Sequence, residues 1–175
     1  DTTKNNYDVD VEVTDEKGRI VPATVPRFHD GYSAFGATAE AGVVDRSWAK
    51  RLIVRGLLSI YEKELQHNIV MKVPYGGVDY GEQVYGANVR YDVAPLKNLE
   101  LEAVASYAYR AIAYTDKSPW VYDWYGVKVK RRRDPGEVDT RPHDQTEWQH
   151  SVYGRALAVG TIAPGHKLRA SFSPA

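Results

Sequence analysis

Side-chain types alternate strictly over residues 99–114. Every second residue from Leu99 to Ala113 is Leu, Ala or Tyr, so this set carries no charge. The residues between them mix charged, small and apolar types, from Glu100 and Glu102 to Tyr114. Because successive side chains of a β-strand point to opposite faces, the pattern predicts a long strand with one face in an apolar medium and the other in a partly polar one.

The same period of two recurs along the chain, whereas helical periodicity is nearly absent. Gln83 to Val93 sets Tyr85 and Val89 against Asn88 and Arg90. The alternation over residues 148–160 is weaker, and apolarity alone does not orient that segment. We predict an all-β fold with about six strands, over residues 33–44, 51–65, 83–93, 99–114 and 148–160 and from Leu168 onward.

The connections between these strands alternate in length. Short links at 45–50, 94–98 and 161–167 are separated by long loops at 66–82 and 115–147. In an antiparallel up-and-down meander, alternate connections emerge at the same end of the sheet. Short turns at one end and long loops at the other are typical of transmembrane β-barrels, and several strands exceed the usual length of about 5–6 residues. The alternative is a soluble β-sandwich, which usually has shorter strands.

The first thirty residues follow a different pattern. Val9, Val11 and Val13 alternate with acidic residues, and Pro22 and Pro26 indicate an edge strand or a connector. We therefore predict a hairpin or extended lead-in over residues 1–30 and a partial β-barrel over residues 31–175, truncated at its C-terminus. The polar start without Met and the end within an alternating run lead us to expect a piece of a longer protein.

Composition excludes several classes of function. Lys+Arg and Asp+Glu number 23 each, so the basic excess of a nucleic-acid binder is missing and no nucleic-acid partner is expected. Cysteine is absent, which excludes disulfides, thiolate metal sites and cysteine nucleophiles. The 13 Tyr and 4 Trp outnumber the 3 Phe, and such amphipathic rings suit the boundary between water and an apolar medium. Several of them fall near predicted strand ends, as interfacial aromatic girdles require.

Several segments resemble TonB-dependent outer-membrane receptors, most closely the large receptors of Bacteroidetes-type bacteria. Residues 27–30 and 39–49 are similar to the early barrel of that family, and residues 61–71 and 73–76 to the strand and extracellular loop that follow. Residues 122–126, followed by Gly136 and Glu137, resemble a later loop. The resemblance covers roughly residues 27–175; its motifs are short, and their order and spacing make it fairly specific.

The resemblance implies a barrel of about 22 strands, closed by a plug and driven through TonB. It also implies a location in the bacterial outer membrane, contact with its lipid, and import of a siderophore, a vitamin, or an oligosaccharide or peptide nutrient. The chain lacks the plug, the TonB box and an aromatic-ended final strand, so TonB would act through the missing plug region. The alternative function is a soluble carbohydrate- or ligand-binding module.

Four aromatic residues in the longest loop are the candidate ligand-binding residues. Exposed rings stack on sugars or flat chelates and serve as anchors in binding sites. The same rings would equally pack the loop upon itself or join an aromatic girdle. The candidates are Trp120, Tyr122, Trp124 and Tyr125.

The remaining polar clusters give weaker signals. His143, Glu147 and His150 have metal-ligating side chains, but they fall where a loop runs into a strand, and a solvated loop is the favoured interpretation. A run of Lys and Arg over residues 128–133 follows the aromatic residues. It would either bind lipopolysaccharide phosphates through charge-assisted contacts or form a solvated surface. No nucleophile, phosphate-loop or dinucleotide motif occurs, so we expect neither an enzyme nor a cofactor or metal. The run comprises Lys128, Lys130, Arg131, Arg132 and Arg133.

Overall fold

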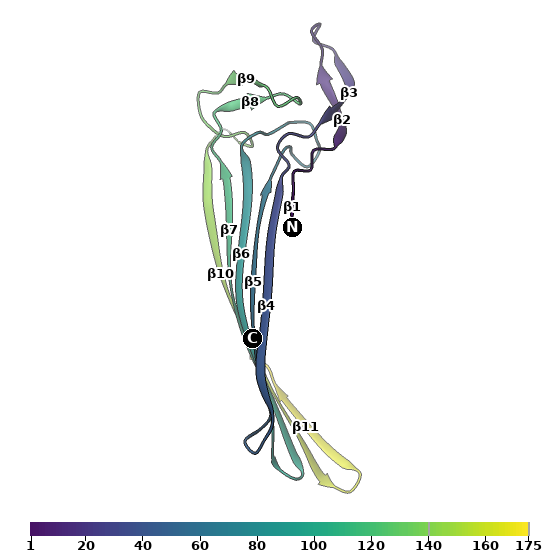
Figure 1. Ribbon diagram of the computed structural model, residues 1–175, viewed down its shortest axis with the longest axis vertical. Coiled ribbons are helices and arrows are strands. Elements are labelled where there is room, and N and C mark those ends of the chain that lie inside the picture. The colour runs from purple at the N-terminus through teal and green to yellow at the C-terminus, as the bar shows by residue number, and fades with distance from the viewer. Residues whose placement is uncertain (140, 175) are drawn as a thin grey trace. The chain divides into compact units, whose positions relative to one another are not determined.

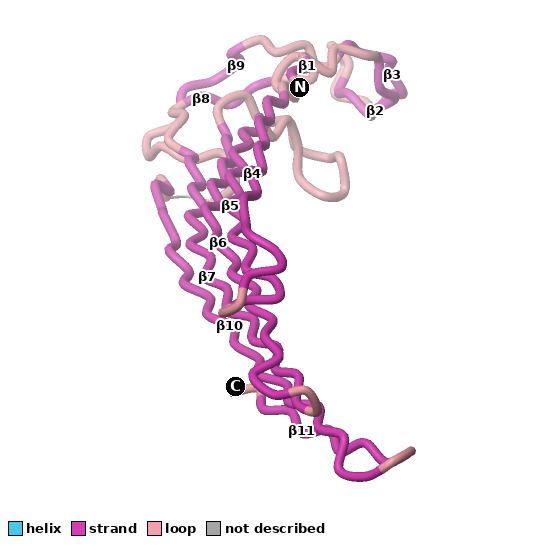
Figure 2. Tube along the Cα trace, turned by 60° about the horizontal axis from the view of Figure 1, so that its bottom comes forward, coloured by secondary structure: helices cyan, strands magenta, loops and turns pink. Residues whose placement is uncertain are grey.

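The computed structural model describes residues 1–139 and 141–174, and every regular element in them is a β-strand (Figure 2). The prediction of an all-β, antiparallel fold is confirmed. Five long strands run side by side, as Figure 1 shows. They are β4 (Tyr32–Arg46), β5 (Ala49–Glu64), β6 (Val78–Leu96), β7 (Leu99–Asp116) and β10 (His143–Ala163).

Two shorter strands complete this sheet. Its order is β1-β4-β5-β6-β7-β10-β11, so all strands after β1 keep their order along the chain. β1 (Thr2–Thr3) pairs with the start of β4, and β11 (His166–Phe172) pairs antiparallel with β10. The large sheet is open, with β1 and β11 as its outermost strands.

Two small hairpins lie outside the large sheet. β2 (Asp8–Thr14) pairs with β3 (Ile20–Pro26), with Val11 opposite Ala23. β8 (Trp120–Tyr122) pairs with β9 (Lys128–Arg131). The lead-in therefore contains a hairpin, and the longest loop contains a second one.

Three turns of the large sheet leave only two residues between their strands. They lie at 47–48, 97–98 and 164–165, and a residue with positive φ occurs in or beside two of them: Asp45 (φ 55°) and Gly165 (φ 77°). Glycine meets such a requirement without steric cost, which fixes a tight turn after Pro164. The longer connections are residues 65–77 and 117–142.

The strand bounds correct the sequence prediction at the long-loop side. β6 starts at Val78 instead of residue 83, and β10 starts at His143 instead of residue 148. The prediction was wrong there because polar side chains such as Asp79 and Asp144 interrupt the apolar alternation. Backbone pairing continues past the point at which one face stops being apolar.

The chain divides into two compact units, which we describe separately. Unit 1 comprises Asp1–Phe35, Ile60–Gln83 and Ala111–Glu147, and unit 2 comprises Gly36–Ser59, Val84–Arg110 and Trp148–Ala175. Unit 1 contains the hydrophobic cluster of Val11, Val25 and Trp124. Unit 2 consists of sheet strands and the three tight turns.

Candidate functional site

One face of the sheet in unit 2 is apolar across all six of its strands. Tyr85 of β6 contacts Tyr109 of β7, and the Tyr109 ring contacts His150 of β10. Ala156 of β10 then pairs with Phe172 of β11. Side chains two residues apart on a strand share a face. None of the residues on this face is Asp, Glu, Lys or Arg. The residues of the face are every second residue, counted from the first, in 37–43, 52–58, 85–93, 99–109, 148–158 and 168–172.

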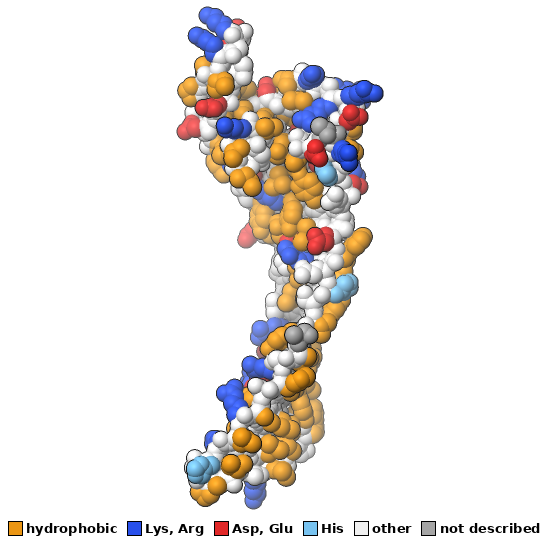
Figure 3. Space-filling view, turned by 180° about the vertical axis from the view of Figure 1, so that it is seen from behind, with side chains coloured by type: hydrophobic (Ala, Val, Ile, Leu, Met, Phe, Trp, Pro, Cys, Tyr) orange, Lys and Arg blue, Asp and Glu red, His pale blue; other side chains and the backbone are white. Residues whose placement is uncertain are grey.

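Large side chains on this apolar face are exposed. Val152 is 83% exposed, Leu168 61% and Phe172 68%. Figure 3 shows hydrophobic side chains gathered near the β10–β11 hairpin, with Lys and Arg along the margin. Exposed apolar patches beyond a few hundred Å² mark contact with a membrane or another protein. This face therefore presents large apolar side chains at the surface of unit 2.

The opposite face of unit 2 carries a row of ion pairs that crosses four strands. Arg51 of β5 lies 3.6 Å from Asp92 of β6, and Arg90 of β6 bonds to Asp92 at 3.1 Å. Arg90 also reaches Glu102 of β7 at 2.8 Å, and Glu102 accepts a further bond from Arg155 of β10. We call these five residues the charge ladder. The two faces of the sheet in unit 2 thus differ in polarity.

Aromatic side chains occur near the two ends of the apolar face. Tyr107, Tyr109 and His150 form one cluster, with the Tyr107 hydroxyl 2.8 Å from Nδ1 of His150. Toward the short turns, the Tyr91 hydroxyl donates to the carbonyl of Trp48 at 2.5 Å. Trp48 itself is 54% exposed. Amphipathic rings at both ends of an apolar band resemble interfacial girdles.

In unit 1, Trp124 is a packing residue. It is 5% exposed and forms the hydrophobic cluster with Val11 and Val25 of the β2–β3 hairpin, while Met71 of the 65–77 connection packs against it. Three segments far apart in sequence therefore share one small core. In this structure Trp124 packs against a distant hairpin, not upon its own loop.

The other three aromatic candidates occupy different environments. The Tyr122 ring stacks on Phe28 with centroids 6.1 Å apart. It also fills the space beside Gly76, where an added Cβ would lie 2.6 Å from the ring. Trp120 is half-buried beneath Lys128, whereas Tyr125 is 57% exposed. The structure does not gather the four rings into one binding surface.

A pair of buried carboxylates fastens the long loop to the sheet. Asp116, at the end of β7, accepts bonds from the backbone N–H of Glu137 (2.7 Å) and Val138 (2.8 Å). The Glu137 carboxylate accepts from Gly76 N–H at 3.0 Å, which adds the 65–77 connection. We call Asp116 and Glu137 the carboxylate clasp. Glu137 is among the residues that carry the family resemblance, whereas no local sequence pattern predicted a role for Asp116.

Burial controls the ionisation of the clasp region. Desolvation raises the pKa of Glu137, backbone N–H donors from Gly76 and Gly77 oppose the rise, and the Asp116 charge adds to it. Burial also raises the pKa of the Tyr75 hydroxyl, with the Asp116 and Glu137 charges adding to that rise. Ionising either group therefore costs more here than in water.

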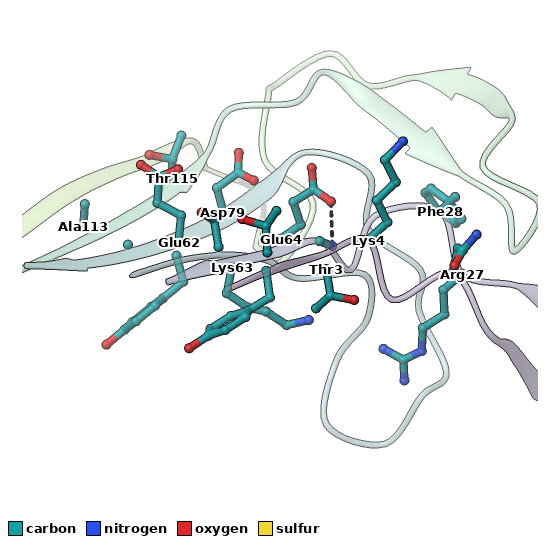
Figure 4. Close-up of a pocket in the computed structure, with 17 residues that line it drawn as sticks. Thr3, Lys4, Arg27, Phe28, Glu62, Lys63, Glu64, Asp79, Ala113 and Thr115 are labelled. Atoms are coloured by element: carbon teal, nitrogen blue, oxygen red, sulfur yellow. Dashed lines mark hydrogen bonds between the residues drawn. The ribbon is translucent and has the colours of Figure 1, made fainter. Parts of the chain in front are cut away.

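A cavity of about 690 Å³ lies in unit 1 beside β5 and β6, and Figure 4 shows its lining. The carboxylates of Glu62, Glu64 and Asp79 project to one side of the strands. Glu64 accepts a bond from Gly31 N–H at 2.7 Å, and His29 lies 3.5 Å from Asp79. These contacts tie the residues just before β4 to β5 and β6, so the carboxylates of Glu64 and Asp79 hold the strand ends.

The three predicted metal-ligand candidates are spread along β10. His143 and Glu147 are four residues apart on an extended strand, which separates them by about 13 Å. His150 has the opposite parity and bonds to Tyr107. Among residues 1–139 and 141–174, no group of three His, Cys, Asp or Glu side chains is placed to hold a metal ion.

Two acidic residues on the polar face of β7 have cationic neighbours. Glu100 pairs with Lys50 at 3.6 Å and Glu102 belongs to the charge ladder, so both carboxylates have cationic neighbours.

No helix in the described part of the chain is long and apolar enough to cross a membrane. Comparison with protein-family models, curated proteins and solved structures gives no match to this chain.

Proposed function

We propose that this chain forms part of the wall of an outer-membrane β-barrel receptor of the TonB-dependent type. The observation that carries the proposal is the contrast between the two faces of unit 2. A barrel wall in lipid alternates apolar residues outward with polar residues inward. The uncharged face that includes Ala103 and Val152 would meet outer-membrane lipid, and the charge ladder would line the interior.

The length of the apolar face supports a membrane span. The part of the uncharged face of β7 that lies in unit 2 runs from Leu99 to Tyr109, and at about 3.4 Å per residue it is about 34 Å long. Strands of such barrels tilt by about 35–45°, which reduces that length to a height of about 25 Å. This equals the usual height of the apolar band, and Tyr107 and Tyr109 then lie at its upper boundary.

The connections and the resemblance support the transport role. Two-residue turns alternate with the 65–77 and 117–142 connections, as short periplasmic turns alternate with long external loops in these barrels. In the intact protein, import of a siderophore, a vitamin, or an oligosaccharide or peptide nutrient would depend on TonB acting through the plug. The 65–77 and 117–142 connections would then be external loops.

Single-cysteine labelling tests the proposal because the chain has no cysteine of its own. Ala103→Cys places a fluorescent probe on the apolar face, and Ser106→Cys places one on the opposite face as a matched control. In outer membranes, we expect nitroxide lipids to quench the probe at 103 strongly and the probe at 106 weakly. Equal quenching at both positions, or a protein absent from the membrane fraction, would contradict the proposal and favour the soluble binding module.

A further inference from the structure

The basic run of the longest loop borders a surface pocket. The pocket has a volume of about 540 Å³ and lies beside β8 and β9. Four of its six lining residues are cationic, and one is a carboxylate. The lining residues are Val121, Lys130, Arg131, Arg132, Arg133 and Asp134.

The Asp134 carboxylate lines the same pocket, but among the described residues it forms no ion pair with these cations. Within residues 1–139 and 141–174, none of the lysines and arginines between positions 128 and 133 forms an ion pair. Most charged side chains of unit 2 are instead paired, as the charge ladder illustrates. The pocket therefore concentrates positive charge that the protein leaves available to a ligand.

Three cations of the run, Lys128, Arg131 and Arg132, contact neutral groups. Arg132 donates from Nη1 to the Gly136 carbonyl at 2.5 Å, and its own N–H donates to the Pro119 carbonyl at 2.7 Å. The Trp120 ring lies beneath two of the others, 5.5 Å from Lys128 Nζ and 6.0 Å from Arg131 Cζ. Such contacts orient cationic groups without cancelling their charge.

We propose that this pocket binds a ligand carrying two or more phosphate groups. Arginine presents a planar fork of donors that matches phosphate oxygens, and charge-assisted bonds of this kind are stronger than neutral ones. Several cations around one pocket favour a diphosphate over a single carboxylate. Because the pocket is built from one loop, the inference does not depend on the location of the sheet in a membrane.

Calorimetric titration of the purified protein with pyrophosphate tests the inference. The double variant Lys130→Gln and Arg133→Gln removes two lining charges and leaves Arg132, which holds the loop, in place. We expect it to bind pyrophosphate about tenfold more weakly than the unmodified protein, through lost charge-assisted bonds. The matched control is Lys17→Gln and Lys97→Gln, which removes two exposed charges elsewhere and should bind as the unmodified protein does.

The outcomes separate the possible sources of phosphate. Vesicles of phosphatidylcholine containing a diphosphorylated glycolipid serve as a second probe, beside vesicles of phosphatidylcholine alone. Binding to pyrophosphate and to the glycolipid vesicles identifies a lipid headgroup, and binding to pyrophosphate alone identifies a small solute. An unmodified protein that binds neither probe, or equal losses in both double variants, would overturn the inference.

Discussion

Nδ1 of His150 on β10 lies 2.8 Å from the hydroxyl of Tyr107 on the neighbouring strand β7. The imidazole ring also contacts Tyr109, with ring centroids 5.2 Å apart. Between positions 148 and 158, His150 is the only residue of the apolar face of β10 with an imidazole or amine side chain. Its Nδ1 atom contacts the Tyr107 hydroxyl on the same face. A polar group on an apolar face thus finds its partner within that face.

The first prediction concerns the energy of this contact. Tyr107→Phe removes the hydroxyl, and His150→Phe keeps a ring beside Tyr109 but removes Nδ1. We expect a coupling energy of about 0.5–1.5 kcal/mol in the double-mutant cycle, since that is the net worth of a typical hydrogen bond. Urea unfolding in detergent micelles measures it. Strictly additive effects of the two substitutions would show that the contact contributes no stability.

The second prediction concerns the core of unit 1. Trp124→Ala should lower the stability of that unit by about 3–5 kcal/mol, because it removes a buried aromatic side chain. The backbone amides of Val11 and Val25 would then exchange faster with solvent, which hydrogen exchange measures. The exposed neighbour Tyr125→Ala is the control, and its effect should stay within about 0.5 kcal/mol. Unchanged exchange at both valines would contradict the packing role of Trp124.

The third prediction is a pH dependence that comes from Glu137. Its pKa lies above the ordinary value of 4.5 in the folded state, so folding favours the protonated carboxyl. The free energy of unfolding is therefore highest below that ordinary value and falls as pH rises through the raised pKa. Glu137→Gln keeps an oxygen acceptor for Gly76 but cannot ionise. Urea unfolding of both proteins at about pH 4 and about pH 7.5 measures the effect.

The comparison between those two proteins isolates this group from other titrations. The stability of the unmodified protein, relative to Glu137→Gln, should decline between the two pH values. A constant difference would mean that burial does not shift the ionisation of Glu137. Asp134→Asn, at an exposed position of the same loop, controls for the removal of one negative charge.

The fourth prediction follows from the proposed membrane location. Ala103→Arg would place a cation on the lipid-facing side near mid-depth and should cost about 2–4 kcal/mol in a bilayer. Ser106→Arg should cost far less, because position 106 lies on the opposite face of the same strand, which carries the charge ladder. Folding titrations in phospholipid vesicles measure both. Equal costs would remove the distinction between the two faces.

The sequence predicted most of the large sheet because alternation is a local signal. Residues 99–114 and 83–93 lie within β7 and β6, and their apolar and polar positions occupy opposite faces. The additional paired residues near Asp79 and Asp144 were missed, because these charged side chains fall at positions of the apolar face and interrupt its alternation. Pattern analysis therefore ends a strand where the apolar residues of one face end, even where backbone pairing continues.

The packing of unit 1 could not be predicted from local sequence patterns because its contacts join residues that are far apart in the chain. Trp124 contacts valines more than ninety residues earlier in the chain, and Asp116 bonds to the backbone of residues 137 and 138. Nothing in the residues around Trp124 distinguishes an aromatic that binds ligand from one that packs a distant hairpin. The local sequence is the same for the exposed Tyr125 ring and the buried Trp124 ring, so only tertiary contacts distinguish their roles.

The two-residue turn at 164–165 has a consequence for β11. Thr161 pairs with Lys167 and Val159 with Arg169, so both cations share the face of the charge ladder. If one inserted residue entered the β10–β11 pairing instead of enlarging the turn, the register would shift by a single step and every side chain of β11 would change face. Lys167 and Arg169 would then face the apolar side, and Leu168 and Phe172 the charged one. Which face of the outermost strand β11 carries Lys167 and Arg169 thus depends on the length of the turn at 164–165. A glycine inserted after Gly165 tests this, and the expected result is a loss of folding in phospholipid vesicles.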